Sequence, residues 1–278
     1  MRERGFSLIE MVVVVAVFTV VTGAVFLLLD VAQQRYRTES EVLDAFQGAR
    51  IALDQITRDI HAAGYPPLKS LSGAQQAANS ASLAYPFAWQ PGYNTQPALA
   101  VACLVPAGLM LGNCNIPGPW DLILEADIDP ENANGVEWIR YSLGGQGDPN
   151  MPDRTTLYRG IASKVAGGDP VAATGRFMTP YVENVMNNAG AADIIRIQAS
   201  YPNVFPGGVP VALFTYRFEN KAGCPNQPPP PNQPVAAPPN CIREVGLTMI
   251  LQSATVDMRS RQPRVITLTG LARRINPS

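Results

Sequence analysis

Histidine is almost absent from this chain: His61 is the only one among its 278 residues. A Ser/His/Asp or Cys/His catalytic arrangement would have to use His61 or do without a histidine. No two cysteines are spaced as CxxC, and no glycine-rich loop of the GxxxxGK type occurs. These absences argue against a zinc site, a phosphate-binding loop and a nucleophilic hydrolase. We therefore expect neither an enzyme nor a bound cofactor or metal, and we interpret His61 as a surface or sheet-packing residue.

Charged residues are also scarce, at 15% of the chain, with a net charge of −1. A nucleic-acid-binding domain normally carries a basic stripe, and no such stripe runs through the sequence. One local group of arginines near the C-terminus is interpreted as a solvated or inter-subunit face: Arg259, Arg261, Arg264, Arg273 and Arg274. DNA contact is the less favoured alternative for this group, and the sequence gives no other evidence for a nucleic-acid partner.

No charge interrupts the chain from Met11 to Leu29. As a helix these nineteen residues span roughly 28 Å, close to the thickness of a bilayer core. A secretory leader has a shorter apolar run that is followed by a small-residue cleavage site, whereas here Gly5 precedes the run. A cut after Gly5 would leave the helix on the protein. Arg2 and Arg4 favour a cytoplasmic N-terminus, with the body of the protein outside.

The segment around Gly5 resembles the processing site of type IV prepilins and type II secretion pseudopilins. The resemblance is carried by Arg2, Arg4, Gly5, Phe6, Ser7, Leu8, Ile9 and Glu10. It implies a leader at residues 1–5, cleavage between Gly5 and Phe6 by prepilin peptidase, and N-methylation of Phe6. The chain would then be the substrate of an enzyme and not itself an enzyme.

Glu10 is an acid at the edge of the apolar run, and an acid within a membrane helix costs ~2.5–3.5 kcal/mol at the bilayer centre and less near an interface. After cleavage, Phe6 would carry an α-ammonium that needs a partner inside a filament of packed apolar helices. Glu10 of a neighbouring subunit could supply it and so set the axial register. Alternatively, Glu10 only complements the positive end of its own helix. Beside this leader we favour the assembly role.

Proline is absent from Asp30 to Ala63, which predicts that one helix continues from Phe6 to Ala63. Residues 6–29 would form its membrane or filament-core half and residues 30–64 its amphipathic half. Its predicted buried face consists of Leu43, Phe46, Leu53, Ile56 and Ile60. Gly64, followed by Tyr65 and two prolines, predicts the end of the helix.

Beyond a loop-rich connector at residues 65–97, we predict a β-rich domain at 98–278. We predict strands at 98–105, 121–128, 136–143, 155–161, 193–201, 209–218, 242–252 and 263–271. A long N-terminal helix packed on an antiparallel sheet gives the class α+β. Five acidic residues form one cluster: Asp121, Glu125, Asp127, Asp129 and Glu131. The last three alternate in a predicted turn whose spacing is not that of an EF-hand, so we favour a solvated turn over a calcium site.

Several segments of the chain look like PilW-like minor pilins and J-type pseudopilins. These are LDQITRDIHAAGY at 53–65, VEWIRYSL at 136–143, TTLYRG at 155–160, YVENV at 181–185 and CIREVGLTMIL at 241–251. Glu10 argues against a K-type pseudopilin, which typically lacks that acid.

The resemblance implies a minor type IV pilin that helps to initiate or cap a pilus. A J-type pseudopilin of a type II secretion system is an alternative, and a stand-alone membrane-anchored binding domain is another. The implied partners are other pilin or pseudopilin subunits, prepilin peptidase and an assembly platform. The implied location is the inner membrane in a single pass, then the pilus or pseudopilus.

The four cysteines lie in the part that we expect to face an oxidising compartment. Pairing of neighbours, Cys103 with Cys114 and Cys224 with Cys241, is the simplest of three connectivities. The proline-rich loop 225–240 favours extended backbone and would form a stiff surface arm, either a tolerated insertion or a partner contact.

Overall fold

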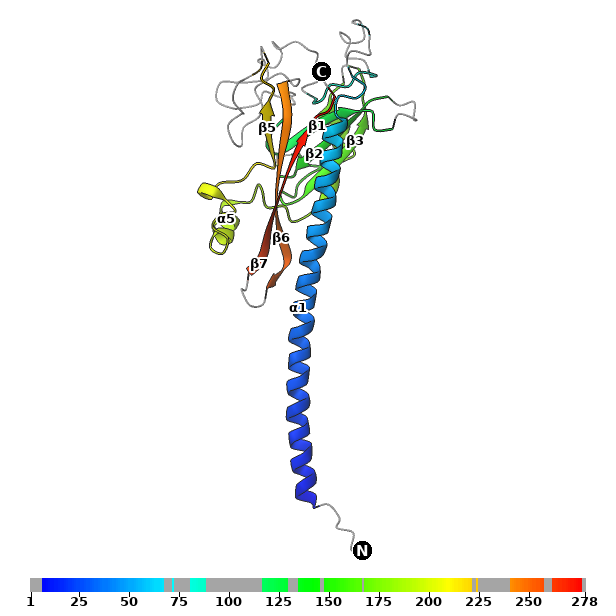
Figure 1. The fold of residues 1–278 in the computed structure, drawn as a ribbon. Coiled ribbons are helices and arrows are strands. Elements are labelled where there is room, and N and C mark those ends of the chain that lie inside the picture. The colour runs from blue at the N-terminus through cyan, green and yellow to red at the C-terminus, as the bar shows by residue number, and fades with distance from the viewer. Residues whose placement is uncertain are drawn as a thin grey trace. The chain divides into compact units, whose positions relative to one another are not determined.

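The computed structural model describes residues 7–67, 72, 81–88, 117–129, 135–145, 148–166, 168–221, 224, 241–257 and 262–276. The chain divides into two compact units. The first comprises Met1–Ala45 and Ser253–Arg264, and the second comprises Phe46–Gln252 and Val265–Ser278. The fold class is α+β as predicted, with one long helix followed by antiparallel sheets (Figure 1). The predicted strand 98–105, both Cys103 and Cys114, and loop 225–240 lie outside the described residues.

Helix α1 runs unbroken from Leu8 to Ala62, over 55 residues. Gly64 follows the end of the helix, and its φ of +80° is the left-handed conformation that glycine adopts most easily there. The Gly64 amide donates to the carbonyl of Glu125 at 2.8 Å, and so ties the end of the helix to a strand. The side-chain amide of Asn276 donates to the carbonyls of Ala62 and Ala63, two of the acceptors that a helix end leaves unpaired.

The first sheet has the order β1-β2-β3-β4 and is antiparallel throughout. Its strands are β1 (Asp121–Ala126), β2 (Glu137–Leu143), β3 (Leu157–Ser163) and β4 (Thr179–Val182). The predictions for the first three hold within a few residues, whereas β4 was not predicted. All of β2 is buried, so both faces of this sheet are covered.

The second sheet has the order β5-β6-β7, with β5 (Phe214–Phe218), β6 (Ile242–Asp257) and β7 (Gln262–Arg273). Strand β5 is shorter than the predicted span 209–218. A 3₁₀ turn, η2 (Pro206–Gly208), precedes it, and Pro210 lacks the amide hydrogen that a strand ladder needs. Within β5 burial alternates as in a half-buried strand, because Phe214 and Tyr216 are buried and Thr215 and Arg217 are exposed.

The strand predicted at 193–201 is wrong, because these residues form helix α5 (Ala191–Gln198). In isolation, the apolar run in AADIIRI fits both the period of a helix, about 3.6 residues, and that of a strand, about two. In the structure Ile194 and Ile197, three residues apart, are buried, whereas Ile195 is 69% exposed. Arg196 and Asp193, also three apart, form an ion pair. A short helix α4 (Pro170–Gly175), capped by Asp169, was likewise not predicted.

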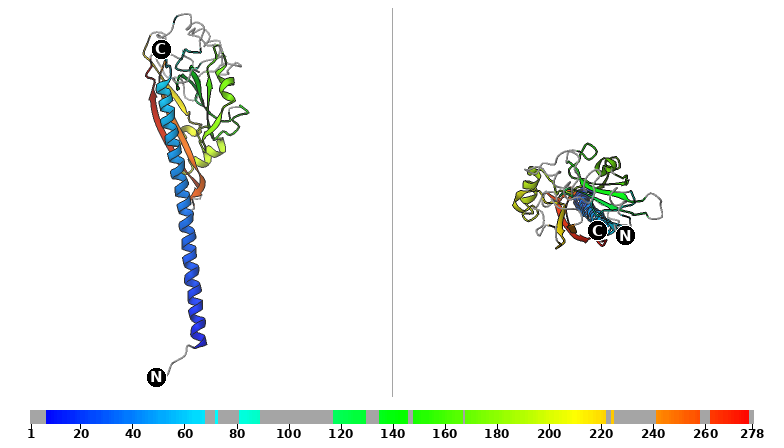
Figure 2. Two further views of the ribbon diagram at one scale, coloured as in Figure 1. Left: turned by 90° about the vertical axis from the view of Figure 1, so that its right-hand side faces the viewer. Right: turned by 90° about the horizontal axis from the view of Figure 1, so that it is seen from above.

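The main core of the second unit is formed by α1 and both sheets. Ala49, Ala52, Ile56 and Ile60 of α1 belong to it. Figure 2 shows the last turns of α1 beside β7, where a Cβ on Gly270 would collide with the side chain of Leu53.

One member of the predicted buried face was placed wrongly, since Leu43 is 57% exposed. A step of three residues falls about 60° short of a full turn, so the steps from Leu43 to Ile56 rotate progressively around the helix. Leu43 and Ile56 therefore lie on different sides of α1.

Candidate functional site: the processing motif and the exposed helix

The start of α1 carries one half of a capping box. The backbone amide of Ser7 donates to Oε2 of Glu10 at 2.9 Å. The Ser7 carbonyl accepts the amides of Glu10 and Met11, at 3.0 and 3.2 Å. This is the arrangement that the pattern Ser-x-x-Glu produces at a helix N-terminus. Within a single chain, Glu10 thus serves its own helix, which is compatible with a second partner because a carboxylate has two oxygens.

The residues of the scissile bond, Gly5 and Phe6, lie outside the described residues, as do Arg2 and Arg4. Cleavage and methylation at this bond stay predictions from the sequence.

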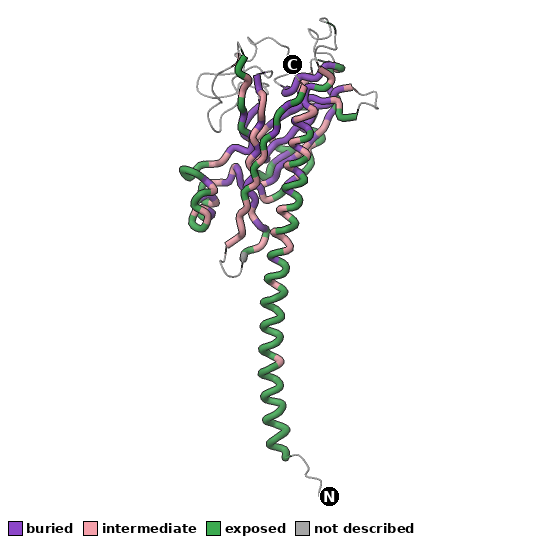
Figure 3. The backbone as a smooth tube through the Cα atoms, in the orientation of Figure 1, coloured by how far each residue is buried: buried purple, intermediate pink, exposed green. Residues whose placement is uncertain are grey.

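The apolar half of α1 is exposed around its whole circumference. Leu8 is 82% exposed, Val20 73% and Leu28 72%. Figure 3 draws this stretch in green almost throughout. The helix is long and apolar enough to cross a membrane, and none of its most apolar window is buried. Because exposed apolar surface costs about 25 cal/mol per Å² in water, this stretch requires lipid or other helices around it.

The other end of α1 is fixed to the first sheet by a buried carboxylate, Asp59. Its Oδ2 accepts hydrogen bonds from the hydroxyl of Tyr141 and from Arg159, the latter at 3.0 Å. Its Oδ1 accepts one from Gln55 at 2.8 Å. Burial, followed by the neighbouring Asp59 carboxylate, raises the pKa of Tyr141, so the phenol remains a donor. Tyr141 and Arg159 are directly opposite each other on β2 and β3.

The far face of the same sheet holds a second buried network, centred on Glu125 of β1. Lys164 lies 2.9 Å from Oε2, and neither side chain is exposed. The indole of Trp138 donates to Oε1 at 2.6 Å, and the amide of Tyr85 donates to Oε2 at 2.8 Å. Lys164 also donates to the carbonyl of Leu83. Burial raises the pKa of Glu125 and lowers that of Lys164.

The Glu125 network does not have the geometry of a catalytic site. Both oxygens of Glu125 accept hydrogen bonds and the pair has no exposed surface, so it cannot meet a substrate. Among the described residues, no group of three or more His, Cys, Asp or Glu side chains is placed to hold a metal ion. These networks hold segments of the body together.

Asp121 and Glu125, the two members of the acidic cluster that precede the predicted turn, lie in β1. Glu125 is buried as above, and Asp121 forms a two-pronged ion pair with Arg140, whose side chain is 5% exposed. Asp127 and Asp129 do follow β1 in an irregular segment, and Glu131 lies outside the described residues. Both acids of β1 are therefore bonded to side chains of β2, Asp121 to Arg140 and Glu125 to Trp138.

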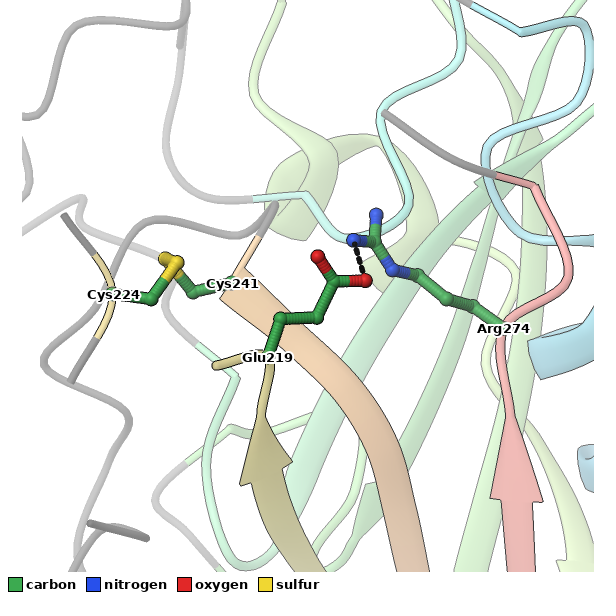
Figure 4. Close-up of a disulfide and its surroundings, with 4 residues drawn as sticks. All are labelled: Glu219, Cys224, Cys241 and Arg274. Carbon is green, nitrogen blue, oxygen red and sulfur yellow. Dashed lines mark hydrogen bonds and ion pairs between the residues drawn. A yellow bond between two sulfur atoms is a disulfide. The ribbon is translucent and has the colours of Figure 1, made fainter. Parts of the chain in front are cut away.

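A disulfide joins Cys224 to Cys241 at the start of β6, across the undescribed loop (Figure 4). The Glu219 amide donates to the Cys241 carbonyl at 2.8 Å, and the Glu219 carboxylate pairs with Arg274 at 3.1 Å. Arg274 is 7% exposed, so the interpretation of the C-terminal arginines as a solvated or inter-subunit face is wrong for this residue. It instead ties the chain beyond β7 to the end of β5.

Sequence reasoning missed the roles of Asp59, Tyr141, Arg159 and Lys164. A usable signal existed for Asp59, which is three residues beyond Ile56 and one before Ile60 and so shares their buried side. A charge at an apolar position of a helix requires a buried partner. No comparable signal in the sequence names Lys164 as the partner of Glu125.

A family model described as the prokaryotic N-terminal methylation motif matches residues 1–26. No curated protein and no solved structure matches the chain. The motif marks substrates of prepilin peptidase and supports a type IV pilin-like family, with a general role as a pilin or pseudopilin. It implies processing by prepilin peptidase and assembly with other pilins. Together with the exposed helix, it fits a single-pass membrane-anchored pilin.

Proposed function

We propose that this protein is a minor type IV pilin that helps to initiate or cap a pilus. Prepilin peptidase cleaves between Gly5 and Phe6, and Phe6 is then N-methylated. The N-terminus faces the cytoplasm because Arg2 and Arg4 precede the span, and the body lies outside. An assembly platform in the inner membrane then moves the subunit into the filament.

One observation carries this proposal: the methylation motif is followed by an apolar helix that the chain's own fold leaves entirely uncovered. In the same helix, Ile56 and Ile60 are fully buried in the body's core. The chain thus covers only one end of α1 and leaves a membrane-length stretch for other molecules. Lipid covers it before assembly, and neighbouring helices cover it in the filament.

Glu10 gives this packing its register. Its Oε2 is held by the Ser7 amide, which fixes the direction of the carboxylate. We infer that Oε1 receives the α-ammonium of Phe6 from a neighbouring subunit. A buried ion pair that tolerates only one alignment favours specificity more than stability.

Two features favour a minor subunit over a major one. Major pilins are usually shorter, and this body carries long insertions such as the loop between Cys224 and Cys241. Its segments at 53–65, 136–143 and 241–251 also resemble PilW-like minor pilins. They resemble J-type pseudopilins as well, which keeps the secretion pseudopilus as the second candidate.

The test is the mass of the mature N-terminal peptide, measured from cells with and without prepilin peptidase. A peptide that begins with N-methylated Phe6 and is lost without the peptidase supports the proposal. A peptide that still begins at Met1 or Arg2 contradicts it and leaves a membrane-anchored binding domain. Recovery in sheared pili separates the pilus from the secretion pseudopilus, because a J-type pseudopilin would be lost from the sheared fraction when the secretion system is deleted.

A further inference from the structure

The side chains of Glu125 and Lys164 bring an acid and an amine together in a site without exposed surface. Nζ of Lys164 lies 2.9 Å from Oε2 of Glu125, and both side chains are 0% exposed. A carbon–oxygen double bond is about 1.2 Å long, so the carboxyl carbon lies within about 4 Å of this nitrogen. Groups that react with each other in a folded site are typically held about 3–3.5 Å apart. A neutral amine at this position is therefore beside a carbon that it can attack.

The surroundings of the pair disfavour its charged forms. Burial raises the pKa of Glu125 and lowers that of Lys164, and the opposing charge in each case is the other member of the pair. The Tyr85 ring adds apolar cover, with its centre 5.5 Å from Nζ. Transfer of one proton from Nζ to Oε2 gives an amine and a carboxylic acid, which cost less to bury than two ions. The absence of exposed surface also favours a reaction that releases water.

The hydrogen bonds around the pair suit an attack of the nitrogen on the carboxyl carbon. The indole of Trp138 donates to Oε1 at 2.6 Å, where it would stabilise the negative charge that develops on this oxygen. The Lys164 nitrogen donates to the carbonyl of Leu83 at 2.5 Å, which holds it beside the carboxyl group. Oε1 is thus placed to become an amide oxygen, and Oε2, nearest to the nitrogen, is placed to leave.

We propose that Lys164 and Glu125 condense to form an amide bond between their side chains within the folded chain. The new bond joins Nζ to the carboxyl carbon Cδ, and the bond from Cδ to Oε2 breaks. One of the three protons of the ammonium stays on the amide nitrogen, where it can donate to Leu83, and two leave with Oε2 as water. Nothing is oxidised or reduced, so the step requires no co-reactant.

The bond would close residues 125–164 into a covalent ring. Glu125 belongs to β1 and Lys164 directly follows β3, so the ring contains β2 and ties its two neighbours together. A cross-link of this kind restricts the unfolded chain, as a disulfide does. The proposal concerns the body of the protein alone, so it stands or falls independently of the pilin assignment.

The experiment is a tryptic digest of the full-length protein, purified in detergent and reduced, with the peptides identified by mass spectrometry. Trypsin does not cut after an acylated lysine. We therefore expect residues 70–140 to be recovered joined to residues 160–176, with a mass lower by one water than the two peptides together. Recovery of 70–140, 160–164 and 165–176 mainly as separate peptides would overturn the proposal.

Variants identify the two atoms that are joined. Lys164→Met should abolish the linked product, whereas the matched control Lys221→Met should retain it, because Lys221 is exposed. A linked product in Lys164→Met would overturn the assignment of the amine.

Glu125→Gln provides a second readout, because its carboxamide can undergo the same attack with loss of ammonia in place of water. The linked product of this variant should therefore have the same mass as that of the wild type. A linked product that still contains the glutamine nitrogen would overturn Glu125 as the acyl donor.

Discussion

The carboxylate of Glu125 and the ammonium of Lys164 lie 2.9 Å apart, and no part of either side chain is exposed. Glu125 belongs to β1, and Lys164 directly follows β3. Through Leu83 and Tyr85 the pair also holds the segment 81–88, which covers this side of the sheet. One buried ion pair therefore joins three parts of the chain that are distant in sequence.

Removing one partner of this pair should be more harmful than removing both. Lys164→Met leaves a buried carboxylate without its cation, and we expect a loss of about 3–5 kcal/mol in the free energy of unfolding. The double variant Glu125→Gln with Lys164→Met should recover part of that loss, because no buried charge remains. Urea unfolding of the full-length protein in detergent, followed by tryptophan fluorescence, measures both.

The control for that series is the exposed pair Asp193–Arg196 on α5, with side chains 49% and 40% exposed. Arg196→Met should change stability by less than about 1 kcal/mol. An equal loss from Arg196→Met and Lys164→Met would show that burial does not increase the contribution of the Glu125–Lys164 pair to the free energy of unfolding.

Removing the Asp59 carboxylate should lower stability more than removing the Tyr141 hydroxyl that donates to it. Asp59→Ala leaves Arg159 without its carboxylate and Tyr141 without an acceptor, so we expect a loss of about 3 kcal/mol. Tyr141→Phe removes one donor and keeps the ion pair, so about 1–2 kcal/mol should be lost. Thermal unfolding of both variants measures the two losses. A larger loss of stability from Tyr141→Phe than from Asp59→Ala would contradict the prediction.

Asp153 should give the body an acid-sensitive contribution to stability. The backbone amide of Thr155, then its hydroxyl, and the hydroxyl of Thr156 hold the pKa of Asp153 below its usual 3.8. The folded state therefore binds fewer protons than the unfolded state near that pH. The contribution is present above pH 3.8 and is lost as pH falls through the lower pKa of the folded state.

The variant Asp153→Asn should be less stable than the wild type at pH 6, and the difference should shrink as the pH falls below 3.8. Urea unfolding at a series of pH values measures it. A difference that is constant with pH would mean that the carboxylate's charge has no part in holding this loop.

Glu10→Gln separates the two roles of Glu10. The amide oxygen of glutamine can still accept the Ser7 amide, so a helix cap survives while the negative charge is lost. If pairing with the Phe6 ammonium sets the register, Glu10→Gln should impair incorporation into sheared pili as severely as Glu10→Ala. Normal incorporation of Glu10→Gln beside a defective Glu10→Ala would assign Glu10 to capping alone.

The elements that could be predicted are those whose signal is local. The absence of proline from residues 30–63 and the glycine at position 64 predict the bounds of α1 to within about two residues. Strict alternation of apolar and polar residues identifies β5. The segment 193–198 failed because its apolar run fits both a helix and a strand, and only burial of Ile194 and Ile197 on one side decides between them.

The sequence by itself determined the processing motif, the membrane-length helix and the class α+β, because each depends on residues that are close in the chain. The tertiary structure alone decided that Glu125 meets Lys164 and that Asp59 meets Arg159, 100 residues apart. It also placed Leu43 on an exposed side of α1. Pairing of charges across a core depends on the register of strands and the rotation of a helix, which local sequence constrains only weakly.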